Sequence, residues 1–336
     1  MEKKFICKIC GKTSPAKIIK IKEQMIGTFE EFEYYECEHC KSLQIINVPT
    51  DMSKYYNNNY YSFISRPFLL YTLIKHLNKS YFSKDFTGSI VKKFYTENEE
   101  LYKLLSDLIN NNKIYYNSKI LDIGCGNGTF LENLADLGFT DLNGMEPFIE
   151  EDLKNEKFCI FKSFINEFYP KKNYDLIFLK DSLEHMENPY ESLLKSKELL
   201  NDKGYLIITI PIKTEYFYKL YGTNWYQLDA PRHFIIFSLR GFETMIKKLD
   251  LNIEKIIFNS DPYSIFISED YALGESMYST NSYLTNNHLK NTLKRRYKKI
   301  ELKVLNKKTT YNNLKPFINE LNEKECSEHA IFLIKK

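Results

Sequence analysis

The sequence lacks any long hydrophobic run. None of its apolar segments reaches the roughly 18 residues of a membrane-spanning helix, so we expect no such helix. Its first residues, MEKKFICKIC, have no long apolar core of the kind that a secretory signal carries, and we expect a cytoplasmic protein. It has few cysteines, seven in all, and in a reducing compartment paired cysteines bind metal more often than they form disulfides. The hydrophobic share of 43% excludes wholesale disorder.

A strong net charge is also absent, but the charge is unevenly distributed. The formal net charge is +3, and residues 1–60 carry nine lysines against eight acids. Residues 288–316 carry ten Lys and Arg against one acid, so an anionic partner should meet this segment rather than the N-terminal one. Its apolar residues recur at helical spacing, which predicts either a solvated helix or a basic surface for an anionic substrate or a membrane face. They are Leu289, Leu293, Tyr297, Ile300 and Val304.

Two C-x-x-C pairs stand near the N-terminus. Cys7 and Cys10 are answered by Cys37 and Cys40, and four thiolates can hold one tetrahedral Zn²⁺. Because four thiolates leave no open coordination position, the metal would be structural. His39 lies inside the second pair and is the weaker alternative ligand. No βαβ pattern surrounds these cysteines, which disfavours a redox pair. The segments between them alternate like hairpin strands, so residues 1–47 are predicted to form a zinc ribbon.

Residues 48–112 are predicted to be a tyrosine-rich linker followed by helical segments at 66–82 and 90–112. The linker tyrosines either pack between the ribbon and the rest or form a flap over a substrate. Residues 113–336 then alternate strand and helix, which predicts an α/β doubly wound sheet of seven strands. A long insertion at 259–328, expected to be mostly helical and to cover the active site, precedes the last strand. The predicted strands are 119–123, 141–145, 158–162, 174–179, 205–210, 251–258 and 330–334.

The most informative motif is ILDIGCGNGTFL at 120–131. An apolar strand ends in Asp122 and leads into a glycine-rich turn at 124–128 and a helix start, and Glu146 follows about 20 residues later, placed to bind ribose hydroxyls. The sixth position of the turn is Thr129, unlike the glycine of dinucleotide-binding loops. A tight turn without a ligand is the structural alternative. The arrangement resembles the S-adenosylmethionine (SAM) site of class I methyltransferases, which have a Rossmann-like sheet with an antiparallel last strand.

The resemblance implies which residues bind SAM. Asp122 and the glycine turn should contact its methionine part, and Glu146 its ribose. Two residues after the third strand would meet the adenine, although the family often has an acid where this chain has Ser163. Lys180, at the end of the fourth strand, should line the site through its backbone. The implied cofactor-binding residues are Asp122, Gly124, Cys125, Gly126, Gly128, Glu146, Ser163, Phe164 and Lys180.

Two histidine-containing motifs follow the fourth and fifth strands. Asp181, Glu184 and His185 are similar to the E-x-x-E-H motif of quinone-biosynthesis O-methyltransferases, which implies a site for a divalent cation such as Mg²⁺. Asp181 is one methylene shorter than the glutamate of that motif. Alternatively, His185 contacts the active site or is a structural histidine.

The segment Pro231–His233 resembles a branch of methyltransferases with N-terminal zinc ribbons that act in surface-glycan or secondary-metabolite sugar pathways. His233 titrates near neutral pH and suits a general base. Arg232 could hold a phosphate or carboxylate through two parallel hydrogen bonds. The alternative is that both residues merely pin the loop to the core. The candidate catalytic residues are therefore His233, His185 and Arg232.

The sequence thus predicts a SAM-dependent methyltransferase that acts at an oxygen of an anionic sugar or glycan intermediate, with carbon and nitrogen methylation as the alternatives. An RNA methyltransferase that uses the ribbon to bind RNA is the rival. It is disfavoured because the ribbon is nearly neutral, whereas phosphate binding needs clustered Lys and Arg. A non-catalytic SAM-binding protein is the third hypothesis, and the acids and bases around the site argue against it.

Overall fold

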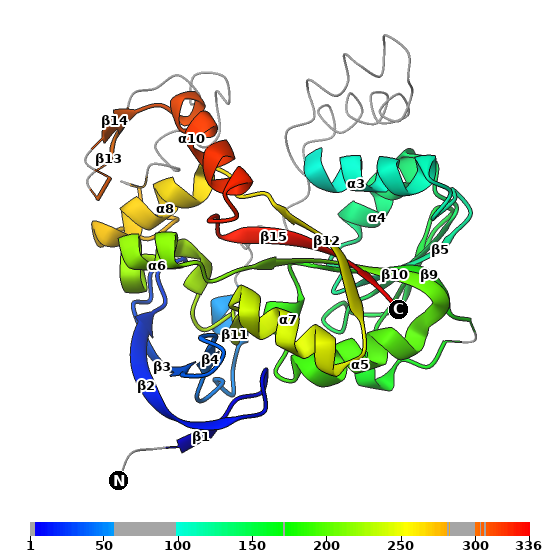
Figure 1. The fold of residues 1–336 in the computed structure, drawn as a ribbon, viewed down its shortest axis with the longest axis horizontal. Coiled ribbons are helices and arrows are strands. Elements are labelled where there is room, and N and C mark those ends of the chain that lie inside the picture. Colours follow the sequence, from blue (N-terminus) through cyan, green and yellow to red (C-terminus); the bar gives the residue numbers. More distant parts are fainter. Residues whose placement is uncertain are drawn as a thin grey trace.

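The computed structural model describes residues 4–56, 99–170, 172–280, 282, 300–302, 304–305 and 307–336. Its largest element is an eight-stranded sheet that runs across the molecule (Figure 1). The strand order is β12 (Asn252–Phe258), β15 (His329–Lys335), β10 (Leu200–Pro211), β9 (Tyr174–Lys180), β5 (Lys119–Ile123), β6 (Asp141–Met145), β8 (Cys159–Phe161) and β7 (Leu153–Lys154).

The sheet is mixed in direction. β8, β6, β5, β9 and β10 are parallel to one another, whereas β15 is antiparallel to both β10 and β12. An antiparallel last strand was expected from the resemblance. Each of the seven predicted strand segments overlaps one of these strands. The predicted number is one too low, because the two-residue strand β7 adds an antiparallel edge beside β8 that is too short to give a hydrophobic pattern.

Helices cover both faces of this sheet, as Figure 1 shows. On one face lie α3 (Glu99–Asn110) and α4 (Thr129–Asp136), and on the other lie α5 (Pro189–Leu199) and α7 (Leu239–Lys248). α3 buries leucines three and four positions apart, as an amphipathic helix should, and it falls within the predicted helical segment 90–112. The predicted segment 66–82 lies outside the described residues.

A second, five-stranded antiparallel sheet is formed mostly by the N-terminal residues. Its order is β1 (Lys4–Ile6), β2 (Thr13–Lys22), β3 (Glu31–Cys37), β4 (Leu43–Ile45) and β11 (Ile235–Ile236). We call β1–β4 the N-terminal sheet. Because β11 comes from the segment that follows Pro231–His233, the N-terminal sheet is hydrogen-bonded to the loop that carries His233. The sequence pattern predicts the β2–β3 hairpin but not the pairing of β4 with β11.

The insertion between β12 and β15 is less uniformly helical than predicted. It contains α8 (Tyr263–Ala272) and α10 (Tyr311–Glu323), and also a hairpin of β13 (Ile300–Leu302) and β14 (Lys307–Thr309). The prediction that Ile300 and Val304 continue a basic helix is therefore wrong. Leu302 is buried. In the turn between β13 and β14, the backbone amides of Val304 and Leu305 donate to the buried Glu269 carboxylate. Residues 288–299, most of the predicted helix, lie outside the described residues.

Candidate active site

The carboxyl ends of β5, β6, β9 and β10 converge on one edge of the large sheet, where doubly wound proteins bind their ligands. The glycine turn that follows β5 lies at this edge. Gly124, Gly126 and Gly128 all have left-handed φ values, of 77°, 54° and 79°. A Cβ on Gly124 would lie 2.7 Å from Ser182 Cβ, and one on Gly128 would lie 2.8 Å from Ile160 Cδ1. The turn therefore requires glycine both for its backbone angles and for space.

The turn is held against the neighbouring strand β6. The backbone amides of Gly124 and Cys125 both donate to the Met145 carbonyl, at 2.8 and 3.2 Å. Cys125 itself is buried beside Gly144, where a Cβ would lie 2.5 Å from the Cys125 sulfur. The role of Cys125 in the turn is therefore to fill space and to supply backbone, and its thiol does not point into open solvent.

Asp122 is the most unusual group at this edge. It is almost completely buried, and its Oδ1 atom has no hydrogen-bond partner. Burial raises the pKa of Asp122 to about 7, although the positive charge of Lys180 opposes the rise. A buried carboxylate without a partner is costly unless a ligand compensates it. The site is therefore built to receive a positively charged or hydrogen-donating group.

Glu146 lies at the end of β6 and faces the same turn. Its carboxylate accepts hydrogen bonds from the backbone amides of Gly126, at 3.0 Å, and Phe148, at 3.2 Å. Burial raises the pKa of Glu146. The carboxylate thus braces the glycine turn.

Two aromatic side chains flank this part of the edge. Phe148 and Phe164 are 78% and 53% exposed, and their rings meet edge to face with centroids 6.1 Å apart. Exposed phenyl rings at a ligand-binding edge can cover a planar base. Phe148 was not predicted, although an aromatic residue two positions after Glu146 was the available signal. The Ser163 hydroxyl donates to the Phe164 carbonyl, so it is used within its own segment.

Lys180 and Asp181 form a charged cluster next to the turn. The Lys180 ammonium lies 3.0 Å from the Asp181 carboxylate, so its side chain takes part as well as its backbone. The Asp181 Oδ1 atom accepts from the Thr209 hydroxyl and from His329 Nε2, at 2.9 and 2.7 Å. Although burial opposes ionisation, Lys180 and His329 lower the pKa of Asp181. His329 was missed because it is 148 residues away in sequence and only the insertion of β15 brings it here.

The predicted cation site at Asp181, Glu184 and His185 is not assembled as expected. The ligand atoms of Glu184 and His185 instead gather with His233, all within 4.8 Å of one another, whereas Asp181 turns toward His329. Asp181 has a left-handed φ of 50°, which aims its side chain away from the Glu184 helical turn. The grouping of Asp181 with Glu184 and His185 is therefore wrong.

His185 and His233 are held in the same way. Nδ1 of His185 lies 2.8 Å from the Arg232 carbonyl, and Nδ1 of His233 lies 2.8 Å from the Gln227 carbonyl. Because a carbonyl only accepts hydrogen bonds, both Nδ1 atoms carry the proton in the neutral rings, and both Nε2 atoms keep a lone pair. Burial lowers the pKa of His185 to about 3, and it also lowers the pKa of His233 although Asp229 opposes this. Both imidazoles are neutral bases at pH 7.

The third member of this cluster is Glu184. Its Oε1 atom lies 4.0 Å from His233 Nε2, and its Oε2 atom is buried without a partner. Burial, together with the nearby charge of Asp181, raises the pKa of Glu184 well above the usual range. The ring centroids of the two histidines are 4.8 Å apart. The cluster therefore presents two neutral bases and one carboxyl group in a small, buried space.

Arg232 is not available to a substrate. It is completely buried, and its guanidinium donates to both Asp229 oxygens, to Glu23 Oε1 at 2.9 Å and to the Tyr55 carbonyl at 3.0 Å. The prediction that it grips a substrate anion is therefore wrong, because its bidentate partner is Asp229 of its own loop. The alternative, that it pins the loop to the core, describes these contacts.

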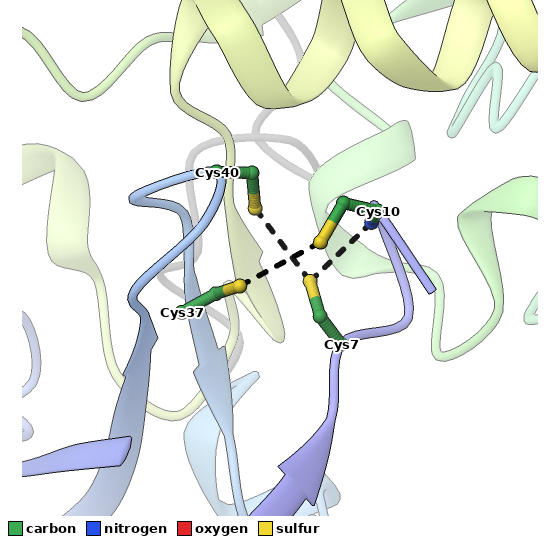
Figure 2. Close-up of side chains that lie close together, drawn as sticks. All are labelled: Cys7, Cys10, Cys37 and Cys40. Carbon is green, nitrogen blue, oxygen red and sulfur yellow. Dashed lines mark hydrogen bonds between the residues drawn. The ribbon is translucent and has the colours of Figure 1, made fainter. Parts of the chain in front are cut away.

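The four N-terminal cysteines point toward one another (Figure 2). The sulfurs of Cys7 and Cys40, and those of Cys10 and Cys37, are each 3.6 Å apart, and all four lie within 4.8 Å of one another. Zn–S bonds of about 2.3 Å in a tetrahedron separate the sulfurs by about 3.8 Å, so the arrangement fits one Zn²⁺. His39 is exposed and does not belong to this group.

The backbone around the two cysteine pairs is matched. The amides of Gly11 and Lys41 donate to the carbonyls of Cys7 and Cys37, both at 2.8 Å, and both residues have left-handed φ values, of 68° and 63°. Two equivalent turns thus aim two thiols each at a common centre. Such preorganisation favours a structural metal over a disulfide, since all four thiols are buried and lie together in one cluster.

Comparisons with known proteins agree with the geometry of the sheet edge. A family model described as a methyltransferase domain matches residues 95–256. A ubiquinone biosynthesis O-methyltransferase of Rickettsia bellii is 32% identical over 186 residues, which are 49% of this chain and 78% of that enzyme. The chain belongs to the SAM-dependent methyltransferases.

Other methyltransferases are similar over shorter or more distant matches. A tRNA U34 carboxymethyltransferase of Helicobacter pylori is 29% identical over 115 residues, 30% of this chain and 44% of that protein. A solved structure of a putative sarcosine dimethylglycine methyltransferase from Galdieria sulphuraria is 14% identical, with a TM-score of 0.44 over 76% of this chain and 89% of that one.

Among the described residues of the present chain, no helix is long and apolar enough to cross a membrane.

Proposed function

We propose that this methyltransferase binds SAM along the turn 124–128 and transfers its methyl group to a hydroxyl oxygen. The unpartnered Asp122 Oδ1 atom carries the first part of the proposal, because SAM brings a sulfonium and an ammonium group that would compensate a buried carboxylate. The backbone of Gly124–Gly128 would lie against its methionine part. Glu146 would take the ribose hydroxyls, and Phe148 and Phe164 would cover the adenine.

SAM supplies an already activated methyl group, so the protein must orient the acceptor and remove its proton. We propose that Nε2 of His233 takes the proton of the acceptor hydroxyl. The His233 ring is neutral and buried, and its Nδ1 is hydrogen-bonded to the Gln227 carbonyl. His185 lies on the other wall of the same cluster and is the second candidate. Methylation at oxygen is also what the name of the Rickettsia relative states for that enzyme.

For the acceptor, a sugar or glycan intermediate is the first class to test. The support is the resemblance of the segment Pro231–His233 to sugar-pathway methyltransferases. Arg232 does not favour an anionic acceptor, because its charge is neutralised by Glu23 and Asp229 within the protein. A quinone precursor and an RNA base are the alternatives that the names of the relatives suggest.

The RNA alternative requires a surface that binds phosphates, and the N-terminal sheet is a poor one. Its cysteines and Tyr34 are buried, and β4 is paired with β11 rather than free to receive another chain. We propose instead that Cys7, Cys10, Cys37 and Cys40 hold one structural Zn²⁺ that fixes this sheet in place.

The proposed function predicts where a labelled methyl group will go. The protein should transfer label from methyl-labelled SAM to a low-molecular-mass hydroxylated fraction when it is incubated with nucleotide sugars, glycan fragments, quinone precursors and total RNA in separate reactions. The product should be an ether by mass spectrometry. Label found only in RNA would favour the RNA alternative, and a carbon- or nitrogen-linked methyl group would contradict the oxygen mechanism.

A further inference from the structure

The loop that carries His233 is held by the N-terminal sheet. The hydroxyl of Tyr34, a completely buried residue of β3, donates to the carbonyl of His233 itself, at 2.8 Å. The next residue, Phe234, accepts a hydrogen bond from the Ile45 amide of β4, at 2.9 Å, and donates one to the Glu184 carbonyl, also at 2.9 Å. The backbone that follows the His233 side chain is thus held by residues of β3 and β4 that lie about 190 to 200 positions away in sequence.

A buried ionic network makes a second connection between the same parts. Arg232 Nη2 donates to Glu23 Oε1, which belongs to the turn between β2 and β3. Glu23 is itself fixed, because its carboxylate also accepts from the amides of Ile26, Gly27 and Thr28 at 2.8 to 2.9 Å. Separating Arg232 from Glu23 would leave uncompensated charge inside the protein, which is costly. The ion pair therefore holds the two segments in one relative position.

The same network reaches both histidines. The Arg232 carbonyl accepts the hydrogen bond from His185 Nδ1, and the Asp229 carboxylate that binds the Arg232 guanidinium lies 3.9 Å from His233 Nε2. A shift of Arg232 would therefore turn one ring and change the electrostatic surroundings of the other. Positioning matters at this scale, since a displacement of about 1 Å can cost a hundredfold in rate.

We propose that the N-terminal sheet is a working part of the active site: Tyr34 and Glu23 of the sheet and its β2–β3 turn, and Arg232 of the loop that Glu23 binds, are positioning residues that fix the orientation of His233 and His185. The proposal rests on the proposed role of His233. The proposal gives the N-terminal sheet a function in methyl transfer rather than in recognition of a macromolecule. None of the three residues needs to touch SAM or the acceptor.

Tyr34→Phe tests the proposal, because it removes one hydroxyl and keeps the ring. Its matched control is Tyr35→Phe on the same strand, whose hydroxyl oxygen lies 2.9 Å from both the Ile6 carbonyl and Gln44 Oε1 inside the N-terminal sheet. Nitrogen NMR of the histidine rings, with His233 assigned by comparison with His233→Gln, should show one neutral Nδ1–H form in the wild type and in Tyr35→Phe. In Tyr34→Phe we expect the His233 signals to shift or split.

An unchanged His233 spectrum in folded Tyr34→Phe would overturn the proposal whatever the acceptor proves to be. If that variant does not fold, Glu23→Gln takes its place, because its amide oxygen can still accept from Arg232 while the charge is lost.

Turnover gives the second readout, with the acceptor that the labelling experiment identifies. Tyr34→Phe should lower kcat about tenfold with unchanged SAM affinity, and it should have no further effect in a His233→Ala background, because the two act as one unit. An equal loss in the His233→Ala background would show a merely structural role and contradict the proposal. If His233→Ala itself keeps wild-type turnover, the proposed base is wrong, and the NMR comparison still decides whether the sheet orients the ring.

Discussion

Replacing His233 with alanine should lower kcat by about a hundredfold or more and leave SAM affinity nearly unchanged, the usual scale for a lost general base. The reason is that Nε2 of His233 keeps a free lone pair when Nδ1 donates to the Gln227 carbonyl. Because burial lowers the pKa of His233 from its usual value, the ring is already neutral at pH 7. With SAM at saturation, kcat should therefore stay high to a lower pH than an ordinary histidine would allow, and should drop only when the ring is protonated.

The comparison for this prediction is His185→Ala, since the two rings share one cluster. A larger loss in His185→Ala would move the base to that residue. Wild-type turnover in both variants, without any requirement for an added divalent cation, would contradict the hydroxyl mechanism. If turnover instead depends on such a cation, the cation should bind Glu184, His185 and His233, because these three side chains lie together.

Replacing both Cys7 and Cys40 with serine should remove bound zinc and destabilise the protein severely. Zinc held by four thiolates contributes its binding free energy to folding. The four cysteines also belong to the same hydrophobic cluster as the large sheet, so loss of the metal should loosen the packing beneath β9 and β10 as well. We expect one zinc per chain in the wild type by metal analysis, and a large drop in the thermal unfolding temperature of the double variant.

The control for the zinc prediction is Cys326→Ser, because Cys326 is exposed and lies outside the group of four. Its zinc content and unfolding temperature should match those of the wild type. Wild-type protein purified under reducing conditions without zinc or another tetrahedral metal would contradict the metal assignment.

Much of the fold could be predicted because its signals are local. The strands β5 and β9 and the second half of β10 are apolar runs that end beside polar or turn residues, and the glycine turn and the cysteine pairs are read directly from spacing. These features depend on a few neighbouring residues. Their chemistry therefore follows from the sequence before any tertiary contact is known.

The features that were missed depend on contacts between distant segments. Arg232 looked like an anion-binding group because its partners Glu23 and Tyr55 lie about 200 and 177 residues away. Asp181 was grouped with Glu184 by sequence distance, but the backbone angle at Asp181 and the insertion of β15 send it to His329. The apolar spacing at Ile300 and Leu302 also fits a strand of alternating residues, and burial of Leu302 decides between the two periods.

Calorimetric titration of SAM into the wild type and into Gly126→Val tests the central claim most directly. The account predicts wild-type binding that tightens as the pH rises toward about 7, with proton release below that pH, because cationic SAM favours the ionised form of Asp122, whose pKa is raised to about 7 in the free protein. Gly126→Val should abolish binding, since Gly126 has a left-handed φ and its backbone must approach the ligand. Gly274→Val, at a left-handed glycine in open space, should bind SAM normally. Wild-type affinity in a folded Gly126→Val protein would contradict the account.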